Sequence, residues 1–291
     1  MQSNNGAKIR PPPIPSNPAR APASRPRGTT TSRSPSSMHA KTTSASCRSS
    51  HPWEGWRLPF LELEGPEQMA LDRWLLERSL QQADSGPVLR FYGWRGPWLS
   101  LGRHQGRLPE HWHVMAAAGS VSLVRRPSGG GAVLHAGGLT YALIWPQAPR
   151  RRRQAYGQTA AWLMDGFRRL GYPLRCGDQA AEAGASDCFA TASPADLVDT
   201  LGQKRIGSAQ YWRHGHLLQH GEILIEPPPQ LWTELFGGPA PAPLPGLSRK
   251  QLIQALQASL EERWDPLRWI DTPLTLDEEE LSPYRLETRP T

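Results

Sequence analysis

Three consecutive glycines, residues 129–131, constrain the fold of this chain more than any other feature. They stand between two short apolar runs, residues 121–124 and 132–134, whose composition predicts strands. Glycine weakens a strand ladder, so a glycine run beside strands indicates that another group must come close to the backbone. Arginines precede the run and His135 follows it. The segment therefore predicts a backbone cradle for a carbonyl, phosphate or acyl group beside charged side chains.

A second segment, residues 202–226, contains the sequence KRIGSAQ followed by LQHGE. Together with RRPSGGGAVLH at 125–135, it resembles the lipoate–protein ligase and octanoyltransferase family, which is related to biotin protein ligases. In that family an Arg-Arg-x-Ser/Thr-Gly-Gly-x-Ala-Val-x-His segment and a Lys-x-x-Gly-Ser-Ala-Gln strand wall an acyl pocket. LGRHQ at 101–105 and QMALD at 68–72 are similar to two further elements of the family. The resemblance covers roughly 56–236.

The positive charge of the chain is concentrated near its N-terminus. The 291 residues carry a formal net charge of +7, but residues 1–52 hold eight Lys or Arg and no Asp or Glu. The remaining 25 basic and 26 acidic residues leave a net charge of −1. Because the motif-bearing part is nearly neutral, no binding to nucleic acid is expected. No apolar stretch of about 20 residues occurs, so no membrane span is expected either.

Composition divides the chain into three parts. Residues 1–52 are rich in Pro, Ser and Arg without a periodic apolar face, which predicts a disordered basic tail. Residues 53–236 form the expected catalytic acyl-transfer domain, and 237–291 hold a Pro-rich linker, a C-terminal helix and an acidic tail. An acid-free, Arg- and Ser-rich segment is also similar to an organelle transit peptide. The expected location is the cytoplasm, or an organelle stroma or matrix if the tail is such a peptide.

Apolar spacing predicts the main elements of the fold. Helices are expected at about 67–82, 109–118, 156–170, 231–236 and 248–263. Strands are expected at 88–94 and 97–101 (as a hairpin around Gly96), 120–127, 131–145, 196–201, 204–213 and 216–226. Strands interleaved with a few helices predict an α+β fold, with a mixed, mainly antiparallel sheet and packed helices. The resemblance implies the biotin/lipoate protein ligase-like catalytic domain.

Two residues could carry the chemistry. Lys204 is the lone lysine between residues 42 and 249, and a lysine kept among arginines indicates a need for a compact charge, although a surface lysine is the alternative. The resemblance implies that Lys204 binds the acyl carbonyl oxygen and stabilises negative charge there. Cys188 lies sixteen residues earlier, where cysteine-using octanoyltransferases carry their nucleophile. A nearby ammonium would favour its thiolate; the alternative is a small buried side chain.

The resemblance also implies a set of substrate-binding residues. These are Arg126, Ser128, Gly129, Gly130, Gly131, His135, Gly207, Ser208, Ala209 and His220. The glycines and small residues would let an acyl chain lie against bare backbone. Each histidine could instead be a hydrogen-bonded residue that shapes its strand, and Arg126 could be a surface residue. No Cys-x-x-Cys or His-Glu-x-x-His spacing occurs, so no metal site is expected.

Two enzyme activities fit the resemblance. The first is an octanoyltransferase that needs no cofactor and moves octanoate from acyl carrier protein to a lipoyl-domain lysine. The acceptor would be a 2-oxoacid dehydrogenase complex or the glycine cleavage H protein. The second is a lipoate–protein ligase, which would use ATP and Mg²⁺ and form a lipoyl-adenylate.

Different residues favour the two activities. Cys188 and the LQHG segment favour the transferase, whereas a third glycine at position 131 is more typical of ligases. A hypothesis of another class is a non-catalytic binding scaffold, which predicts that Cys188 and Lys204 are replaceable.

Overall fold

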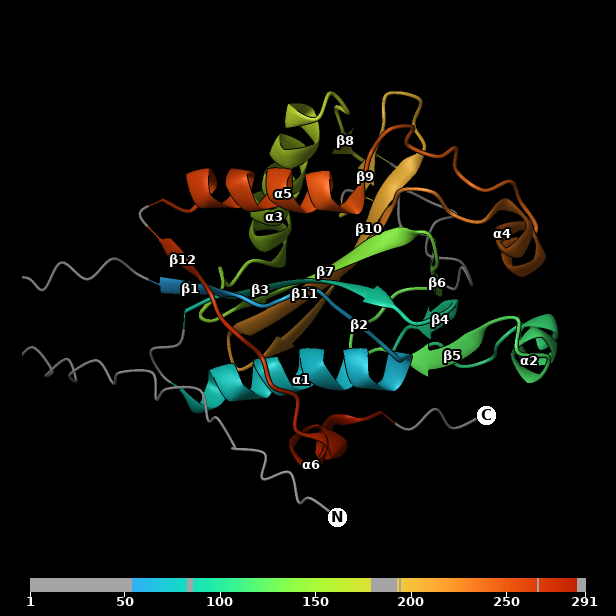
Figure 1. Ribbon diagram of the computed structural model, residues 1–291, viewed down its shortest axis with the longest axis horizontal. Coiled ribbons are helices and arrows are strands. Elements are labelled where there is room, and N and C mark those ends of the chain that lie inside the picture. The colour runs from blue at the N-terminus through green and yellow to red at the C-terminus, as the bar shows by residue number, and fades with distance from the viewer. Residues whose placement is uncertain (1–53, 83–85, 179–192, 194, 266, 287–291) are drawn as a thin grey trace, which may run out of the picture. The chain divides into compact units, whose positions relative to one another are not determined.

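A mixed β-sheet forms the centre of the described structure (Figure 1). The computed structural model describes residues 54–82, 86–178, 193, 195–265 and 267–286. Within these residues the sheet has nine strands, in the order β12-β1-β3-β7-β11-β10-β9-β8 with β2 beside β3. They are β1 (Glu54–Arg57), β2 (Leu61–Leu63), β3 (Val88–Trp94), β7 (Gly138–Trp145), β8 (Arg175–Cys176), β9 (Leu197–Val198), β10 (Lys204–Arg213), β11 (His216–Leu224) and β12 (Arg268–Asp271).

A second, three-stranded sheet has the order β5-β4-β6. It consists of β4 (Trp98–Leu101), β5 (Ser122–Arg125) and β6 (Val133–His135). Strand β4 is parallel to β5 and antiparallel to β6. The expected hairpin between 88–94 and 97–101 is therefore wrong, because β3 and β4 belong to different sheets. Gly96 adopts a φ of 77° between them and turns the chain out of the main sheet.

The expected strand over 131–145 is interrupted. Strand β6 ends at His135, and β7 begins at Gly138 in the other sheet. Gly137 lies between them with a φ of 68°, and a Cβ there would lie 1.9 Å from the carbonyl oxygen of Glu226. The glycine run at 129–131 consequently does not join two neighbouring strands, since β4 lies between β5 and β6.

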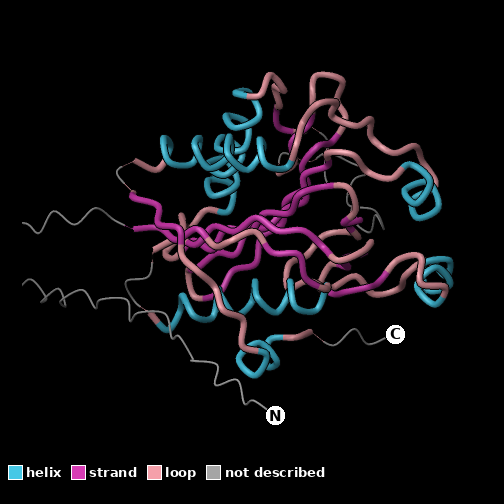
Figure 2. The backbone as a smooth tube through the Cα atoms, viewed as in Figure 1, coloured by secondary structure: helices cyan, strands magenta, loops and turns pink. Residues whose placement is uncertain are grey.

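Six α-helices accompany the sheets in the described residues. They are α1 (Gly65–Gln81), α2 (Glu110–Ala117), α3 (Arg152–Arg169), α4 (Pro229–Phe236), α5 (Arg249–Arg263) and α6 (Glu278–Leu281). Pro66 and Glu67 suit the first turn of α1, and Ser248 and Gln251 form a reciprocal capping box at the start of α5. Helix α1 covers one face of the main sheet, and α3 and α5 cover the other (Figure 2). This arrangement confirms the α+β prediction.

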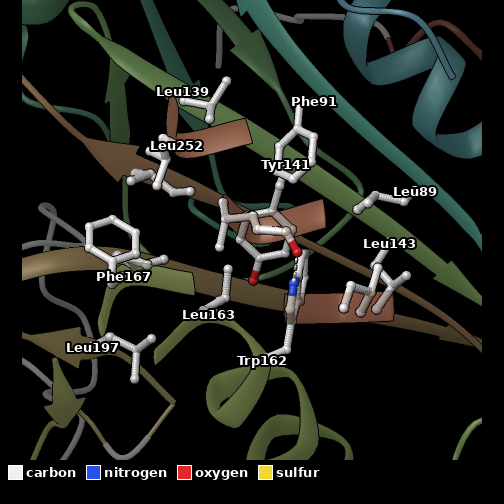
Figure 3. Close-up of a cluster of buried hydrophobic side chains, with 14 of the residues drawn as sticks. Leu89, Phe91, Leu139, Tyr141, Leu143, Trp162, Leu163, Phe167, Leu197 and Leu252 are labelled. Atoms are coloured by element: carbon white, nitrogen blue, oxygen red, sulfur yellow. Dashed lines mark hydrogen bonds between the residues drawn. The ribbon is translucent and has the colours of Figure 1, made fainter. Parts of the chain in front are cut away.

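Strand β7 contributes to a core on each face of the sheet, because its side chains alternate. Tyr141 packs with Trp162 of α3 in the cluster beneath α3 and α5 (Figure 3). Ala142 and Ile144 pack with Leu71 of α1 on the opposite face. Within the described part of the chain, no helix combines the length and apolar composition needed to cross a bilayer.

The register of three strands places polar residues on the α1 face. In the antiparallel pair β10–β11, Gly207 lies opposite Glu222 and Ala209 lies opposite His220. In the pair β11–β7, Glu222 lies opposite Thr140. The small residues of β10 therefore lie beside a histidine and a carboxylate, and this leaves space above the sheet at that point.

Candidate active site

A pocket lies where the α1 face of the main sheet meets α1 and the small sheet. Thirteen residues of the described structure line it: Met69, Tyr92, Ser100, Arg126, Val133, His135, Thr140, Gly207, Ser208, Ala209, His220, Gly221 and Glu222. They come from α1, from the adjacent strands β3, β7, β11 and β10, from β4 and β6, and from the turn after β5. The fold thus brings residues that are far apart in the sequence to one site.

Arg126 holds the glycine turn from inside. Its Nη2 atom donates to the carbonyl oxygens of Gly129 and Gly131, at 2.8 and 2.6 Å. Its Nη1 atom donates to the carbonyl oxygen of Ser100 at 2.7 Å. Gly130 adopts a φ of 98°, a conformation that favours glycine. Arg126 is buried, so it is not a surface strand residue, and its charge lies at the pocket wall.

A first hydrogen-bonded chain joins Ser128, His220 and Asp72. The Nδ1 atom of His220 lies 2.8 Å from Oδ2 of Asp72, and Nε2 lies 2.6 Å from Oγ of Ser128. Because a carboxylate only accepts, Nδ1 carries a proton and donates to Asp72, while Nε2 shares a hydrogen bond with the serine hydroxyl. Arg90 donates to Oδ1 of Asp72 at 2.8 Å, and the Tyr92 hydroxyl donates to Oδ2 at 3.2 Å.

The charge of Asp72 is fixed by these partners. Burial alone would raise the pKa of Asp72, but Arg90 and His220 outweigh burial and hold that pKa below its usual value. The Asp72 carboxylate is therefore an anion at neutral pH, paired with the Arg90 guanidinium inside the protein.

A second chain of the same kind joins Ser100, His135 and Glu222. The Nε2 atom of His135 lies 2.7 Å from Oγ of Ser100, and Nδ1 lies 2.7 Å from Oε2 of Glu222. The Thr140 hydroxyl donates to the same Glu222 oxygen, and the Trp94 ring stacks on the imidazole at a centroid distance of 4.0 Å. Burial lowers the pKa of His135 despite the neighbouring carboxylate. The imidazole is therefore neutral at pH 7, with its proton on Nδ1.

In both hydrogen-bonded chains, the buried polar atoms are paired with one another. In each chain a serine hydroxyl, an imidazole and a carboxylate satisfy one another's hydrogen bonds, so both ring nitrogens of His135 and of His220 are engaged. An apolar chain could lie against this wall without separating a buried polar group from its partner. The wall is consequently suited to hydrocarbon although many of its residues are polar.

Lys204 begins strand β10, three residues before Gly207, and is not among the residues that line the pocket. Its Nζ atom lies 3.0 Å from Oδ2 of Asp196, and both side chains are buried. The same oxygen accepts from the backbone N–H and the hydroxyl of Ser193, at 2.9 and 2.8 Å. Cys188 lies outside the described residues. Asp196 therefore links Lys204 to Ser193, which follows segment 179–192 in the sequence.

The structure brings most of the sequence-predicted binding residues together. Those on the pocket surface are Arg126, His135, Gly207, Ser208, Ala209 and His220. Ser128 and the glycines 129–131 form the adjoining turn, which Arg126 and His220 hold in place. The structure does not bring Lys204 onto the surface of this pocket.

Several residues of the site were missed by the sequence analysis. They are Met69, Asp72, Tyr92, Ser100, Val133, Thr140, Gly221 and Glu222. Five of them lie in motifs noted in the sequence: Met69 and Asp72 in QMALD, Val133 in RRPSGGGAVLH, and Gly221 and Glu222 in LQHGE. Glu222 also lies two residues after His220, on the same face of a strand. In the described part of the chain, no three His, Cys, Asp or Glu side chains gather so that they could hold a metal ion.

Comparison with known sequences shows which proteins share these segments. Residues 64–239 match a family model described as the lipoyl protein ligase A/B catalytic domain. The octanoyltransferase LipM of Carboxydothermus hydrogenoformans is 37% identical over 182 residues, which cover 60% of this chain and 66% of that protein. LipM of Symbiobacterium thermophilum is 36% identical over 171 residues, covering 56% and 62%. The chain thus spans slightly less than two thirds of the length of these relatives.

Comparison with solved structures supports the fold. A crystal structure of lipoate-protein ligase A bound with ATP superposes with a TM-score of 0.65 at 22% identity, covering 79% of this chain and 92% of that chain. A bipartite lipoate protein ligase of Thermoplasma acidophilum, studied with its E2 lipoyl domain, gives a TM-score of 0.62 at 19% identity, covering 80% and 91%. At these identities the likeness shows the fold, and it confirms the ligase-like architecture expected from the motifs.

Proposed function

Because the chain belongs to the lipoyl protein ligase A/B catalytic domain family, we propose that it transfers an octanoyl group to a lysine of a lipoyl domain through a thioester on Cys188. The observation that carries this proposal is the 36–37% identity to two proteins named octanoyltransferase LipM. The cysteine in SDCF, sixteen residues before Lys204, supports the thioester route.

The first half-reaction is an exchange of thioesters. The Cys188 thiolate attacks the acyl carbonyl of octanoyl–acyl carrier protein, the carbonyl–sulfur bond of the donor breaks, and the released carrier thiolate takes up a proton. Lys204 donates to the carbonyl oxygen while negative charge develops there. A buried ammonium held by Asp196 supports this role, because a donor already in place needs no reorganisation during the reaction.

The second half-reaction forms the amide. The neutral amine of a lipoyl-domain lysine attacks the acyl-Cys188 carbonyl, the carbon–sulfur bond breaks, and the thiol is regenerated as the nitrogen loses its proton. The octanoyl chain occupies the pocket between β10, β11 and α1, beside Arg126, His135 and His220. No cofactor takes part in this route, and residues 53–236 form the catalytic unit.

We assign the donor and acceptor by the chemistry of the reaction. Acyl carrier protein supplies the thioester, and a lipoyl domain of a 2-oxoacid dehydrogenase complex or the glycine cleavage H protein receives the acyl group. All must share one compartment, namely the cytoplasm, or an organelle stroma or matrix if residues 1–52 act as a transit peptide.

A second candidate is an ATP-dependent lipoate–protein ligase. The glycine at position 131 favours it, and so does the structural likeness to a ligase bound with ATP. In that reaction ATP with Mg²⁺ would activate a free acid as an acyl-adenylate, and pyrophosphate would leave. The turn at 129–131 and Lys204 would then hold the adenylate.

Intact-mass measurement separates these functions. Wild type and Cys188→Ser are mixed with octanoyl–acyl carrier protein without ATP. The intact mass of each protein is measured before and after treatment with hydroxylamine. The transferase predicts an octanoyl adduct on wild type that hydroxylamine removes, and no thioester on the variant. Acyl transfer to an apo lipoyl domain that requires ATP and free acid, with no adduct, would establish the ligase. A protein that binds a lipoyl domain equally well without Cys188 and Lys204, and transfers nothing, would be the scaffold.

A further inference from the structure

The pocket runs across the main sheet rather than along one strand. Its lining includes Gly207 on β10, His220 on β11, Thr140 on β7 and Tyr92 on β3, and these four strands are neighbours in that order. Adjacent strands lie about 4.8 Å apart, so three spacings span roughly 14 Å. The pocket therefore has a β10 end and a β3 end.

Lys204 defines which end receives the acyl head group. Lys204 does not line the pocket but begins β10, so in the proposed function a carbonyl oxygen bound to its ammonium places the head group at the β10 end. An extended chain advances by about 1.2 Å per bond, so the seven carbon–carbon bonds of an octanoyl group span about 8 Å. The methyl carbon would then lie near β7, and a van der Waals contact of about 4 Å brings it within reach of side chains that extend from the β3 end. This step rests on the proposed function, in which Lys204 contacts the carbonyl.

Two side chains, Met69 and Tyr92, bound the β3 end. They belong to one buried cluster, with exposed fractions of 2% and 1%. Gln68 fastens this corner, because its Nε2 atom donates to the carbonyl oxygen of Gly93 at 2.7 Å and so ties the neighbour of Met69 to the neighbour of Tyr92.

The two side chains differ in their freedom to move. The hydroxyl of Tyr92 donates to Asp72 at 3.2 Å, and the Arg90 guanidinium lies 3.8 Å from the centre of its ring. Tyr92 is therefore a fixed wall. Met69 has an unbranched thioether with three rotatable bonds and adapts its shape to the space available.

We propose that Met69, set against the fixed ring of Tyr92, determines the length of acyl chain that this enzyme accepts. The substrate class is a medium-chain acyl group whose methyl end packs on the Met69 thioether. Each further pair of methylenes would lengthen the chain by about 2.4 Å and push it into this corner. Shortening residue 69 should admit longer chains, and enlarging it should favour shorter ones.

A competition experiment tests this assignment. Wild type, Met69→Ala, Met69→Phe and Met164→Ala each receive equimolar hexanoyl, octanoyl and decanoyl groups, first as acyl carrier protein thioesters without ATP. A second series uses the free acids with ATP and Mg²⁺. The ratio of the three acyl groups delivered to an apo lipoyl domain is read by intact mass. Met164 is the matched control, because it is a partly buried methionine that packs in the cluster on the opposite face.

The expected result is a change in the ratio of the three acyl groups delivered. Met69→Ala should raise the decanoyl-to-octanoyl ratio by roughly tenfold, the effect of accommodating two methylenes. Met69→Phe should raise the hexanoyl-to-octanoyl ratio. If Met69→Ala does not fold, the ratio in Met69→Phe tests the assignment of chain length to Met69. Met164→Ala should keep the wild-type ratios.

Other outcomes separate this inference from the proposed function. Wild-type ratios in both Met69 variants would overturn the length assignment while octanoyl transfer by wild type still supported the transferase. Transfer seen solely with free acid and ATP would overturn the transferase. The ratios from that series would then test whether Met69 sets the chain length accepted by a ligase. A wild type that delivers no acyl group in either series would overturn both.

Discussion

The Nδ1 atom of His220 lies 2.8 Å from Oδ2 of Asp72, a contact that joins strand β11 to helix α1 across 148 residues of sequence. The same carboxylate pairs with Arg90, and all three side chains are buried. The contact therefore fastens α1 to the sheet directly beside the pocket.

Replacing Asp72 should unfold this corner. Asp72→Asn leaves the Arg90 guanidinium buried without its anion, and we expect the free energy of unfolding to fall by about 3–5 kcal/mol. Urea denaturation at pH 7 measures the change. Glu62→Gln is the control, because it breaks the exposed pair with Arg249 and should alter stability by less than about 1 kcal/mol. Equal effects of the two substitutions would show that the buried pair does not stabilise the fold.

Acyl transfer should require a lysine, and not merely a cation, at position 204. Lys204→Arg keeps a cation beside Asp196, so its melting temperature should stay closer to wild type than that of Lys204→Met, which leaves the carboxylate without that ammonium. Since a guanidinium cannot reproduce a compact donor, acyl transfer by Lys204→Arg should fall by about 10²–10³-fold. Single-turnover transfer to an apo lipoyl domain gives the rate. A fully active Lys204→Arg would remove the lysine from the mechanism.

Stability should decline below neutral pH in part through His135. Burial holds the pKa of His135 below its ordinary value of 6.5. As pH falls through that ordinary value, the unfolded chain binds a proton that the folded protein does not, so the free energy of unfolding decreases. The pKa of His216 is lowered as well, by burial and by His214. His135→Gln should therefore lose less stability than wild type between pH 7.5 and 5.5, and its pH dependence should weaken without vanishing.

The pH experiment has a direct comparison. Urea unfolding of wild type, His135→Gln and His216→Gln at both pH values separates the two histidines. If His135→Gln and wild type lose the same stability between the two pH values, His135 is not held neutral by the fold.

Two glycines of the site should respond differently to a methyl group. At Gly221 a Cβ would lie 2.6 Å from the carbonyl oxygen of Gly207 and 2.7 Å from the Tyr141 ring, so Gly221→Ala should destabilise by about 1–3 kcal/mol. At Gly129 no heavy atom lies within 4 Å of an added Cβ, so Gly129→Ala should leave the melting temperature near that of wild type. Differential scanning calorimetry of both variants checks the contrast, and a destabilised Gly129→Ala would contradict it.

Those features of the fold that depend on local sequence are predicted correctly. Helix α1 and strands β10 and β11 follow from short-range spacing, and the glycine turn and its arginine belong to one contiguous motif. The hairpin around Gly96 was wrong because periodicity identifies a strand but not its partner. The chain changes direction at Gly96, which has a positive φ, and β4 then belongs to another sheet.

The partners of the two histidines depend on topology. Asp72 meets His220 because α1 packs on the face of β11 that carries His220 and Glu222, and spacing along the chain does not determine that packing. Ser100 meets His135 because β4 inserts between β5 and β6. Met69 lies in the QMALD motif, but its side chain and that of Tyr92 are typical of core residues, so the sequence does not show that they line the pocket.

The register of β10, β11 and β7 determines both hydrogen-bonded chains of the site at once. His220 and Glu222 lie two residues apart on β11 and serve different hydrogen-bonded chains. A slip of one residue would turn both away from α1 and present Gln219 and Gly221 in their place. Both chains would be lost in one step, together with the small residues opposite them. A one-residue insertion that shifted this register would therefore remove both hydrogen-bonded chains together, whereas a substitution of one side chain affects one of them.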